Sequence, residues 1–217
     1  MLSAEAAHTD THDAHDAHGH HDLVENNFMG VPNIKLAMWA FLGSECMFFG
    51  SLIGTYFFYK GKSLAPPHPA EIFDIQITTI STFLLLMSSL TMALGVDSMK
   101  TGKSMRARNF ILATALLGAC FVGFQVFEFS HFAHMGLGLG TNLFGSSFYV
   151  MTGFHGTHVT VGVIWLLMMA ALIHNGHIEP GRYLPVEVGG LYWHFVDIVW
   201  IIIFTFVYLL EFASKIL

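Results

Sequence analysis

The chain has 217 residues, of which 54% are hydrophobic and only 11% are charged, and its mean hydropathy is +0.59. Soluble globular domains carry about 25% charged residues, so this composition excludes that class and predicts a polytopic membrane protein. The formal net charge of −6 argues against nucleic acid as a partner, because much of the acid lies in a polar tail at the start of the chain.

The first segment, residues 1–27, is rich in Ala, Asp, Thr and His and has almost nothing apolar to bury. We therefore expect a disordered tail. Histidines at this density can bind Zn, Cu or Ni weakly, but no second set of ligands accompanies them, so a solvated tail is the favoured interpretation. The six histidines are His8, His12, His15, His18, His20 and His21.

Five apolar segments follow, and each is long enough to cross a bilayer core of about 30 Å. The predicted fold is an all-α membrane bundle of five transmembrane helices that occupies residues 28–217. The basic loop around residues 100–108 belongs on the cytoplasmic side by the positive-inside rule, which places the N-terminus inside and the C-terminus outside. The five predicted spans are about residues 34–59, 75–97, 109–132, 147–173 and 191–213.

The first span carries Glu45 roughly 16 Å deep, near the middle of the bilayer. A carboxylate at that depth is costly, so we expect Glu45 to be protonated, paired, or lining a polar cavity. The simplest alternative is a neutral acid that hydrogen-bonds a hydroxyl on a neighbouring helix.

The third span ends in a polar ladder of residues spaced three apart, Gln125, Glu128, His131 and His134. A Glu-x-x-His motif is typical of di-iron bundles, but such a site needs the motif twice, and this chain has it once. We interpret the ladder as a hydrogen-bonded polar seam near the outer interface. A free-standing di-iron or haem membrane enzyme is the more distant alternative.

The fourth span places His155 and His158 on one helix face, flanked by glycines that allow close helix approach. Two such histidines could ligate a metal or haem, but a hydrogen bond to a carboxylate or carbonyl of a neighbouring helix is the favoured interpretation. The following loop carries His177 and Arg182, which suit anionic lipid head groups.

The last span carries His194 and Asp197, also three apart and on one face. Both should point toward protein or trapped water and away from lipid. Glu45, Glu128 and Asp197 are thus the three predicted buried membrane carboxylates, and the histidines are expected to form an interhelix polar network. The sequence offers no predicted catalytic residue and no predicted metal-ligand set. A transporter with Glu45 and Asp197 as a proton relay is disfavoured, because five helices do not divide into two equal repeats.

Four separated segments carry a resemblance to a known family. They are LGSECMFFG around Glu45, FQVFEF around Glu128, SSFYVMTGFHGTHV, and YWHFVDIVW. Together they resemble subunit III of the haem-copper respiratory oxidases, the cytochrome c oxidase subunit III family, over about residues 30–217. The mitochondrial form of that family has seven helices, and this chain resembles its last five.

The resemblance implies a non-catalytic subunit of a proton-pumping terminal oxidase in the bacterial cytoplasmic membrane, where aerobic respiration reduces oxygen to water. It implies packing against catalytic subunit I, alongside subunit II, with haem and copper in those partners and none in this chain. Membrane lipids, including bound phospholipid, are further expected partners. Glu45 matches the family's carbodiimide-reactive carboxyl group.

The electron donor of the complex is not encoded in the chain itself. The amino-acid sequences of the TGFHGTHV and YWHFVDIVW segments resemble cytochrome c oxidase more closely, so cytochrome c is the expected donor. The histidine-rich tail instead resembles some quinol oxidase subunits, which makes subunit III of a quinol oxidase the alternative.

Overall fold

The structure is a computed structural model that describes residues 30–60, 62, 75–210 and 213. The histidine-rich tail expected over residues 1–27 therefore lies outside the described residues. Five helices in the described part of the chain are long and apolar enough to cross a membrane, which confirms the predicted all-α bundle with five spans. They are α1 (Asn33–Tyr59), α3 (Ile75–Lys100), α4 (Ser104–His134), α5 (Leu143–His174) and α6 (Leu184–Ile203).

Three helices begin before the positions that hydropathy alone suggested. The turn between α3 and α4 is short because Gly102 adopts a positive φ of 74°, so α4 starts at Ser104. At the start of α5, the Asn142 side chain accepts a hydrogen bond of 2.6 Å from the Gly145 N–H and caps the helix. A proline in the first turn of α6 fits a helix start, since that turn needs no N–H donor.

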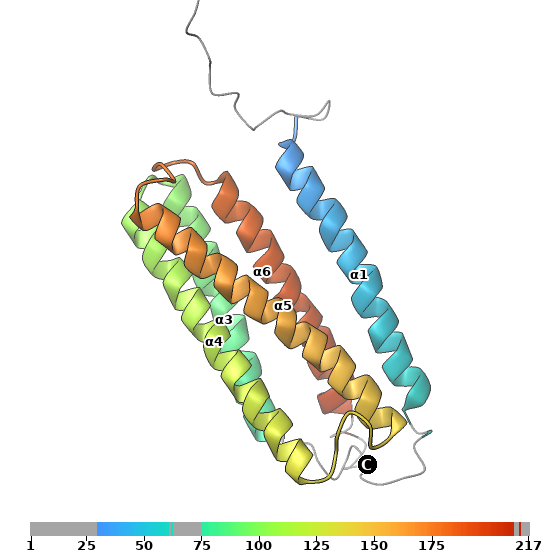
Figure 1. The fold of residues 1–217 in the computed structure, drawn as a ribbon. Coiled ribbons are helices and arrows are strands. Elements are labelled where there is room, and N and C mark those ends of the chain that lie inside the picture. Colours follow the sequence, from blue (N-terminus) through green and yellow to red (C-terminus); the bar gives the residue numbers. More distant parts are fainter. Residues whose placement is uncertain (1–29, 61, 63–74, 211–212, 214–217) are drawn as a thin grey trace, which may run out of the picture.

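Four of the helices pack together and the fifth lies at their side. In Figure 1, α3, α4, α5 and α6 form the body of the bundle, and α1 lies against α5 and α6. The apolar stretch of α1 is only 6% buried, whereas that of α6 is 56% buried. Helix α6 is therefore the central element and α1 a peripheral one.

Two tryptophans of α6 fill the centre of the bundle. The Trp193 ring lies so close to Gly118 of α4 and Gly162 of α5 that a side chain at either glycine would overlap it. The indole N–H groups of Trp193 and Trp200 donate to Ser88 Oγ and Thr82 Oγ1 on α3, each at 2.9 Å. These bonds satisfy the polar end of each indole inside the apolar core and fix α6 against α3.

Helix α6 does not continue regularly to its end. A π-helical segment, η1 (Phe204–Leu209), follows Ile203, and the Leu210 N–H donates to the Thr205 carbonyl five residues earlier. This wider turn places Tyr208 in the interior, where its ring is 1% exposed.

Candidate functional site

The candidate site is the set of polar side chains inside the bundle, and its first member is Glu128 of α4. Glu128 is 9% exposed. Thr78 of α3 donates to its Oε1 at 2.8 Å, and the Tyr208 hydroxyl donates to its Oε2 at 3.3 Å. One carboxyl group thus joins α3, α4 and the π-helical segment.

The second acid, Asp197 of α6, is 4% exposed and bonds α3 through a serine. Ser89 Oγ donates to Asp197 Oδ2 at 2.5 Å, and the same oxygen lies 3.0 Å from His194 Nδ1. His194 and Asp197 do share one face of α6, as their spacing predicted. The serine that links them was not singled out in the sequence.

The third acid, Glu45, pairs with a histidine across the contact between α1 and α5. Glu45 Oε2 lies 3.2 Å from His158 Nε2, and the two side chains are 18% and 19% exposed. His158 Nδ1 lies 2.8 Å from the Phe154 carbonyl. A carbonyl oxygen can only accept, so Nδ1 carries a hydrogen and donates it to Phe154, which directs Nε2 toward the carboxyl group of Glu45.

A shallow groove of about 270 Å³ runs beside this pair. Its walls come from α1, α5 and α6, and the indole of Trp165 and the ring of Tyr192 give it an aromatic side. The Tyr192 hydroxyl donates to the His158 carbonyl at 3.0 Å, which ties α6 to α5 at the same level. His158 of the pair is consequently part of the wall of this groove.

His155 lies deeper than its neighbour and behaves differently. Its ring is fully buried, stacks on Trp200 with ring centres 4.9 Å apart, and meets the edge of Phe121 at 5.8 Å. Within the described residues neither of its ring nitrogens has a hydrogen-bond partner. The interhelix hydrogen bond expected for His155 is thus replaced by aromatic packing, because Trp200 directs its own N–H toward α3.

The ladder on α4 divides between the inside and the outside of the bundle. Gln125 is buried and its Nε2 donates to the Thr152 carbonyl of α5 at 2.7 Å. His131 and His134 are exposed, and their imidazole rings make no hydrogen bond within the part of the chain that is described. Each step of three residues falls about 60° short of a full turn, so three steps lead to the opposite face of the helix. The expected seam therefore ends at Glu128.

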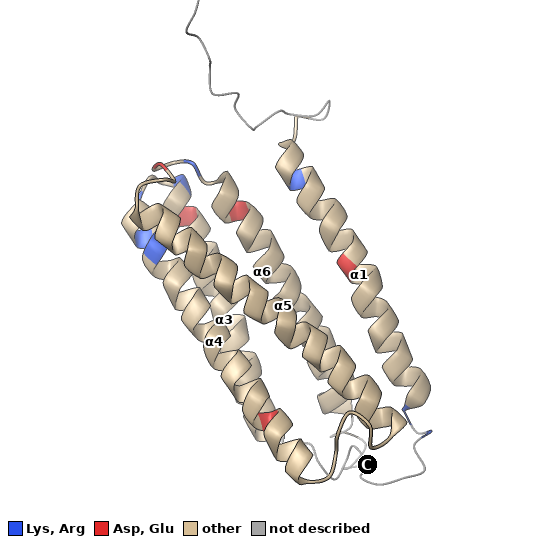
Figure 2. Cartoon of the chain, in the orientation of Figure 1, with Lys and Arg blue, Asp and Glu red and all other residues tan. Residues whose placement is uncertain are grey.

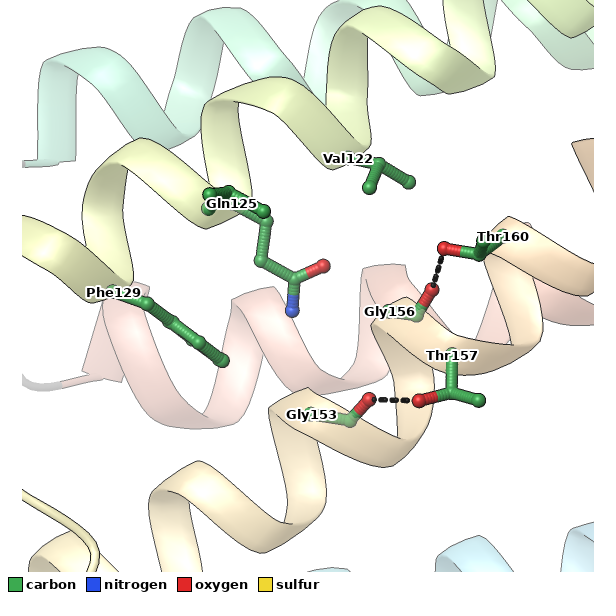
Figure 3. A pocket seen from close by; sticks show the side chains of 8 residues that line it. Val122, Gln125, Phe129, Gly153, Gly156, Thr157 and Thr160 are labelled. Carbon is green, nitrogen blue, oxygen red and sulfur yellow. Dashed lines mark hydrogen bonds between the residues drawn. The ribbon is translucent and has the colours of Figure 1, made fainter.

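Gln125 also lines a cavity of about 260 Å³ between α4 and α5. Figure 3 shows its amide reaching from α4 toward Gly156 of α5, where a side chain would overlap it. The remaining walls are almost entirely apolar, and they are Val122, Val126, Phe129, Gly153, Thr157 and Thr160. This cavity is a shallow opening between two packed helices, with one buried amide on its floor.

Charged residues gather at one end of the bundle, at the α3–α4 turn and the start of α6, as Figure 2 shows. Glu187 of α6 binds two lysines there, Lys35 of α1 at 2.6 Å and Lys100 of α3 at 3.4 Å. His177 and Arg182 are exposed in the α5–α6 loop near this end. Their assignment to lipid head groups stays a prediction.

Among the described residues, no three side chains of His, Cys, Asp or Glu come together in a way that could hold a metal. The two histidines predicted to share a face of α5 separate into a stacked ring, His155, and a paired ring, His158. Instead, the polar side chains inside the bundle connect two or three neighbouring helical segments.

The hydroxyl groups of α3 are the residues that sequence reasoning missed. From the sequence alone, we interpret these Ser and Thr residues as packing residues, because a hydroxyl can bond the backbone of its own helix. In the structure they form hydrogen bonds with side chains of α4 and α6, namely Glu128, Trp193, Asp197 and Trp200. A signal was present in their helical spacing, which places Thr78, Thr82, Ser88 and Ser89 toward one side of α3.

Comparison with known proteins gives a consistent result. The family model described as cytochrome c oxidase subunit III matches residues 7–212. The quinol oxidase subunit 3 of Bacillus spizizenii is 40% identical over 175 residues, which cover 81% of this chain and 86% of that protein. The cytochrome c oxidase subunit 3 of Bacillus sp. (strain PS3) is 38% identical over 180 residues, or 82% and 86% of the two chains. The cytochrome bo(3) ubiquinol oxidase subunit 3 of Pseudomonas putida is 35% identical, over 81% and 84%.

Proposed function

Because this chain belongs to the cytochrome c oxidase subunit III family, and is thus a multi-pass membrane subunit of a haem-copper oxidase complex, we propose that its role there is structural support of the catalytic subunit. In this role it stabilises subunit I and supports proton uptake by that subunit. The oxidoreductase activity belongs to the complex, and haem and copper are held by partner subunits I and II.

The observation that carries this proposal is that the buried acids form hydrogen bonds between helices. Glu128 and Asp197 each accept hydrogen bonds from hydroxyls of α3, and Asp197 does so at a level where α6 also donates an indole N–H to α3. Side chains engaged in this way hold helices in place. Such a bundle presents a preformed surface to a larger membrane partner.

Support for proton uptake comes from Glu45. Its carboxyl group is paired with the imidazole of His158 inside a predicted span, and that histidine also lines a groove between α1, α5 and α6. In the cell, we place the complex in the bacterial cytoplasmic membrane. The basic residues near the α3–α4 turn favour an N-terminus in the cytoplasm and a C-terminus outside.

The first candidate for the electron donor is cytochrome c, because the GFHGTHV and YWHFVDIVW segments resemble those of cytochrome c oxidase. Quinol is the second candidate. It is favoured by the name of the Bacillus spizizenii relative and by the histidine-rich tail.

A purification through a tag on this chain in mild detergent tests the proposal. Haem bands in a reduced-minus-oxidised spectrum, together with copper, are expected in the recovered complex and not in the isolated subunit. Oxygen consumption with reduced cytochrome c and with quinol then identifies the donor. Stoichiometric iron in the isolated chain would overturn the supporting role and favour an enzyme centred on Glu128.

A further inference from the structure

Helices α3 and α6 together form an outward face that differs from the rest of the bundle surface. We call it the α3–α6 face. Its residues are exposed or half-buried, and the polar pair Ser89 and His194 lies among apolar and small side chains. The face consists of Leu86, Ser89 and Ala93 on α3, and Leu191, His194 and Ile198 on α6. The two helices run antiparallel here, since Trp193 bonds Ser88 while Trp200 bonds Thr82.

The polar pair is the outer end of a hydrogen-bonded chain that leads into the bundle. Ser89 has one hydroxyl hydrogen, which it donates to Asp197 Oδ2, so its oxygen accepts from His194 Nδ1–H. Nε2 of the uncharged imidazole is then a hydrogen-bond acceptor. Within the described residues this nitrogen has no partner, and neither has the buried Asp197 Oδ1.

The depth of His194 makes the lack of a partner costly. It lies ten residues into a span of 26, and therefore about 15 Å from the start of the helix, in the middle of the hydrocarbon region. Ionisable groups at that depth almost always face protein or a water-filled space, because acyl chains cannot satisfy them. A half-buried imidazole with an open acceptor indicates that protein covers this face.

We propose that the α3–α6 face is the docking surface for a transmembrane helix of another subunit of the oxidase, and that this helix presents a hydrogen-bond donor to His194 Nε2. The inference rests on the proposed function and adds to it the face and the chemistry of the contact. Donor side chains that suit a membrane interior are Ser, Thr, Tyr, Asn, Gln and Trp.

The surroundings of His194 fit a helix better than a lipid chain. Ala93 leaves room for close approach beside the polar pair, and Leu86 and Ile198 supply an apolar rim. On the opposite side, the outer surfaces of α4 and α5 present large apolar residues such as Leu116 and Ile164, at 65% and 62% exposure. That surface suits acyl chains.

Photo-crosslinking in the intact complex tests the location. A photoreactive phenylalanine analogue at Ala93 is expected to crosslink another oxidase subunit, and the same group at Ala119, an exposed alanine of α4, is expected to crosslink lipid only. Crosslinks from Ala93 to lipid alone, or to a second copy of this chain, would overturn the proposal. Should the chain not copurify with an oxidase at all, the proposed function itself fails.

Substitution of the acceptor tests the chemistry. In His194→Leu, the fraction of this chain retained by the complex during detergent washing should fall, with association about fivefold weaker, as expected for one lost interhelix hydrogen bond. His194→Gln keeps an acceptor and should recover most of that loss. Equal retention of the Leu variant and the wild type would overturn the assignment of His194, while Ala119→Trp controls for a general disturbance of the bundle surface.

Discussion

Helices α1 and α6 cross the same membrane but are held in opposite ways. Helix α6 is buried over 56% of its apolar stretch and is fixed by two indoles that bond α3. Helix α1 is buried over only 6%, and its polar contacts include Glu45 with His158 and Lys35 with Glu187. Extensive packing thus sets the position of α6, whereas α1 packs through fewer buried residues, among them Phe49 and Tyr56, and its attachment depends more strongly on these charged contacts.

The strongest test of this comparison removes the central ring of α6. Trp193→Ala deletes a buried indole that contacts α4 and α5 and bonds Ser88, so we expect a loss of about 3 kcal/mol in the free energy of unfolding. Trp39→Ala on α1, where the ring is 51% exposed, should change it by less than about 0.5 kcal/mol. Reversible unfolding in mixed micelles, followed by circular dichroism, measures both. Equal losses would remove the distinction between the two helices.

A smaller loss is expected when the acid of α4 is replaced. Glu128→Leu removes the acceptor of hydrogen bonds from Thr78 and Tyr208, which should cost about 1–2 kcal/mol. The same unfolding assay applies. Glu128→Gln keeps one acceptor and should lie between the variant and the wild type, and a leucine variant as stable as wild type would contradict the joining role of this carboxyl group.

The next effect concerns α1 itself. His158→Leu removes the partner of Glu45 and should weaken the attachment of α1 by about 1 kcal/mol. Spin labels on the outer sides of α1 and α5 should then report a broader distance distribution in the variant than in the wild type. Ile164→Leu, at an exposed position of the same helix, is the matched control and should leave the distribution unchanged.

The same pair makes a separate chemical prediction. Glu45→Gln should assemble normally, because an amide can still bond the imidazole, but carbodiimide should no longer label the chain. Mass spectrometry of the labelled subunit measures this. Unchanged labelling of the glutamine variant would show that another carboxyl group is the reactive one.

The smallest effect is expected at the charged end of α1. Lys35→Ala breaks the ion pair with Glu187, in which both side chains are about one-fifth exposed, and should cost about 0.2–1 kcal/mol. Added salt should reduce the difference between variant and wild type, because it screens the pair. A difference that is independent of salt would assign the loss to packing of the lysine stem.

The sequence predicted the five spans because length and hydropathy are sufficient for that purpose. It also placed His194 and Asp197 on one face, since spacing along a helix is local. It did not predict that Ser89 would link them, because this depends on the register of α3 against α6. It also did not predict that His155 would stack on Trp200 without a hydrogen bond. That arrangement depends on a third helix, because the Trp200 N–H donates to Thr82 of α3.

The π-helical segment at the end of α6 determines the rotational phase of the residues that follow it. One extra residue in the turn advances every later side chain by about 100° around the helix axis, without changing the direction of the chain. Trp200 lies before the π-helical segment, and Tyr208 lies inside it, near its C-terminal end. Deletion of one residue from Phe204 to Val207 would therefore keep the tryptophan against α3 while turning the tyrosine away from Glu128, so at this point chain length counts as much as residue identity.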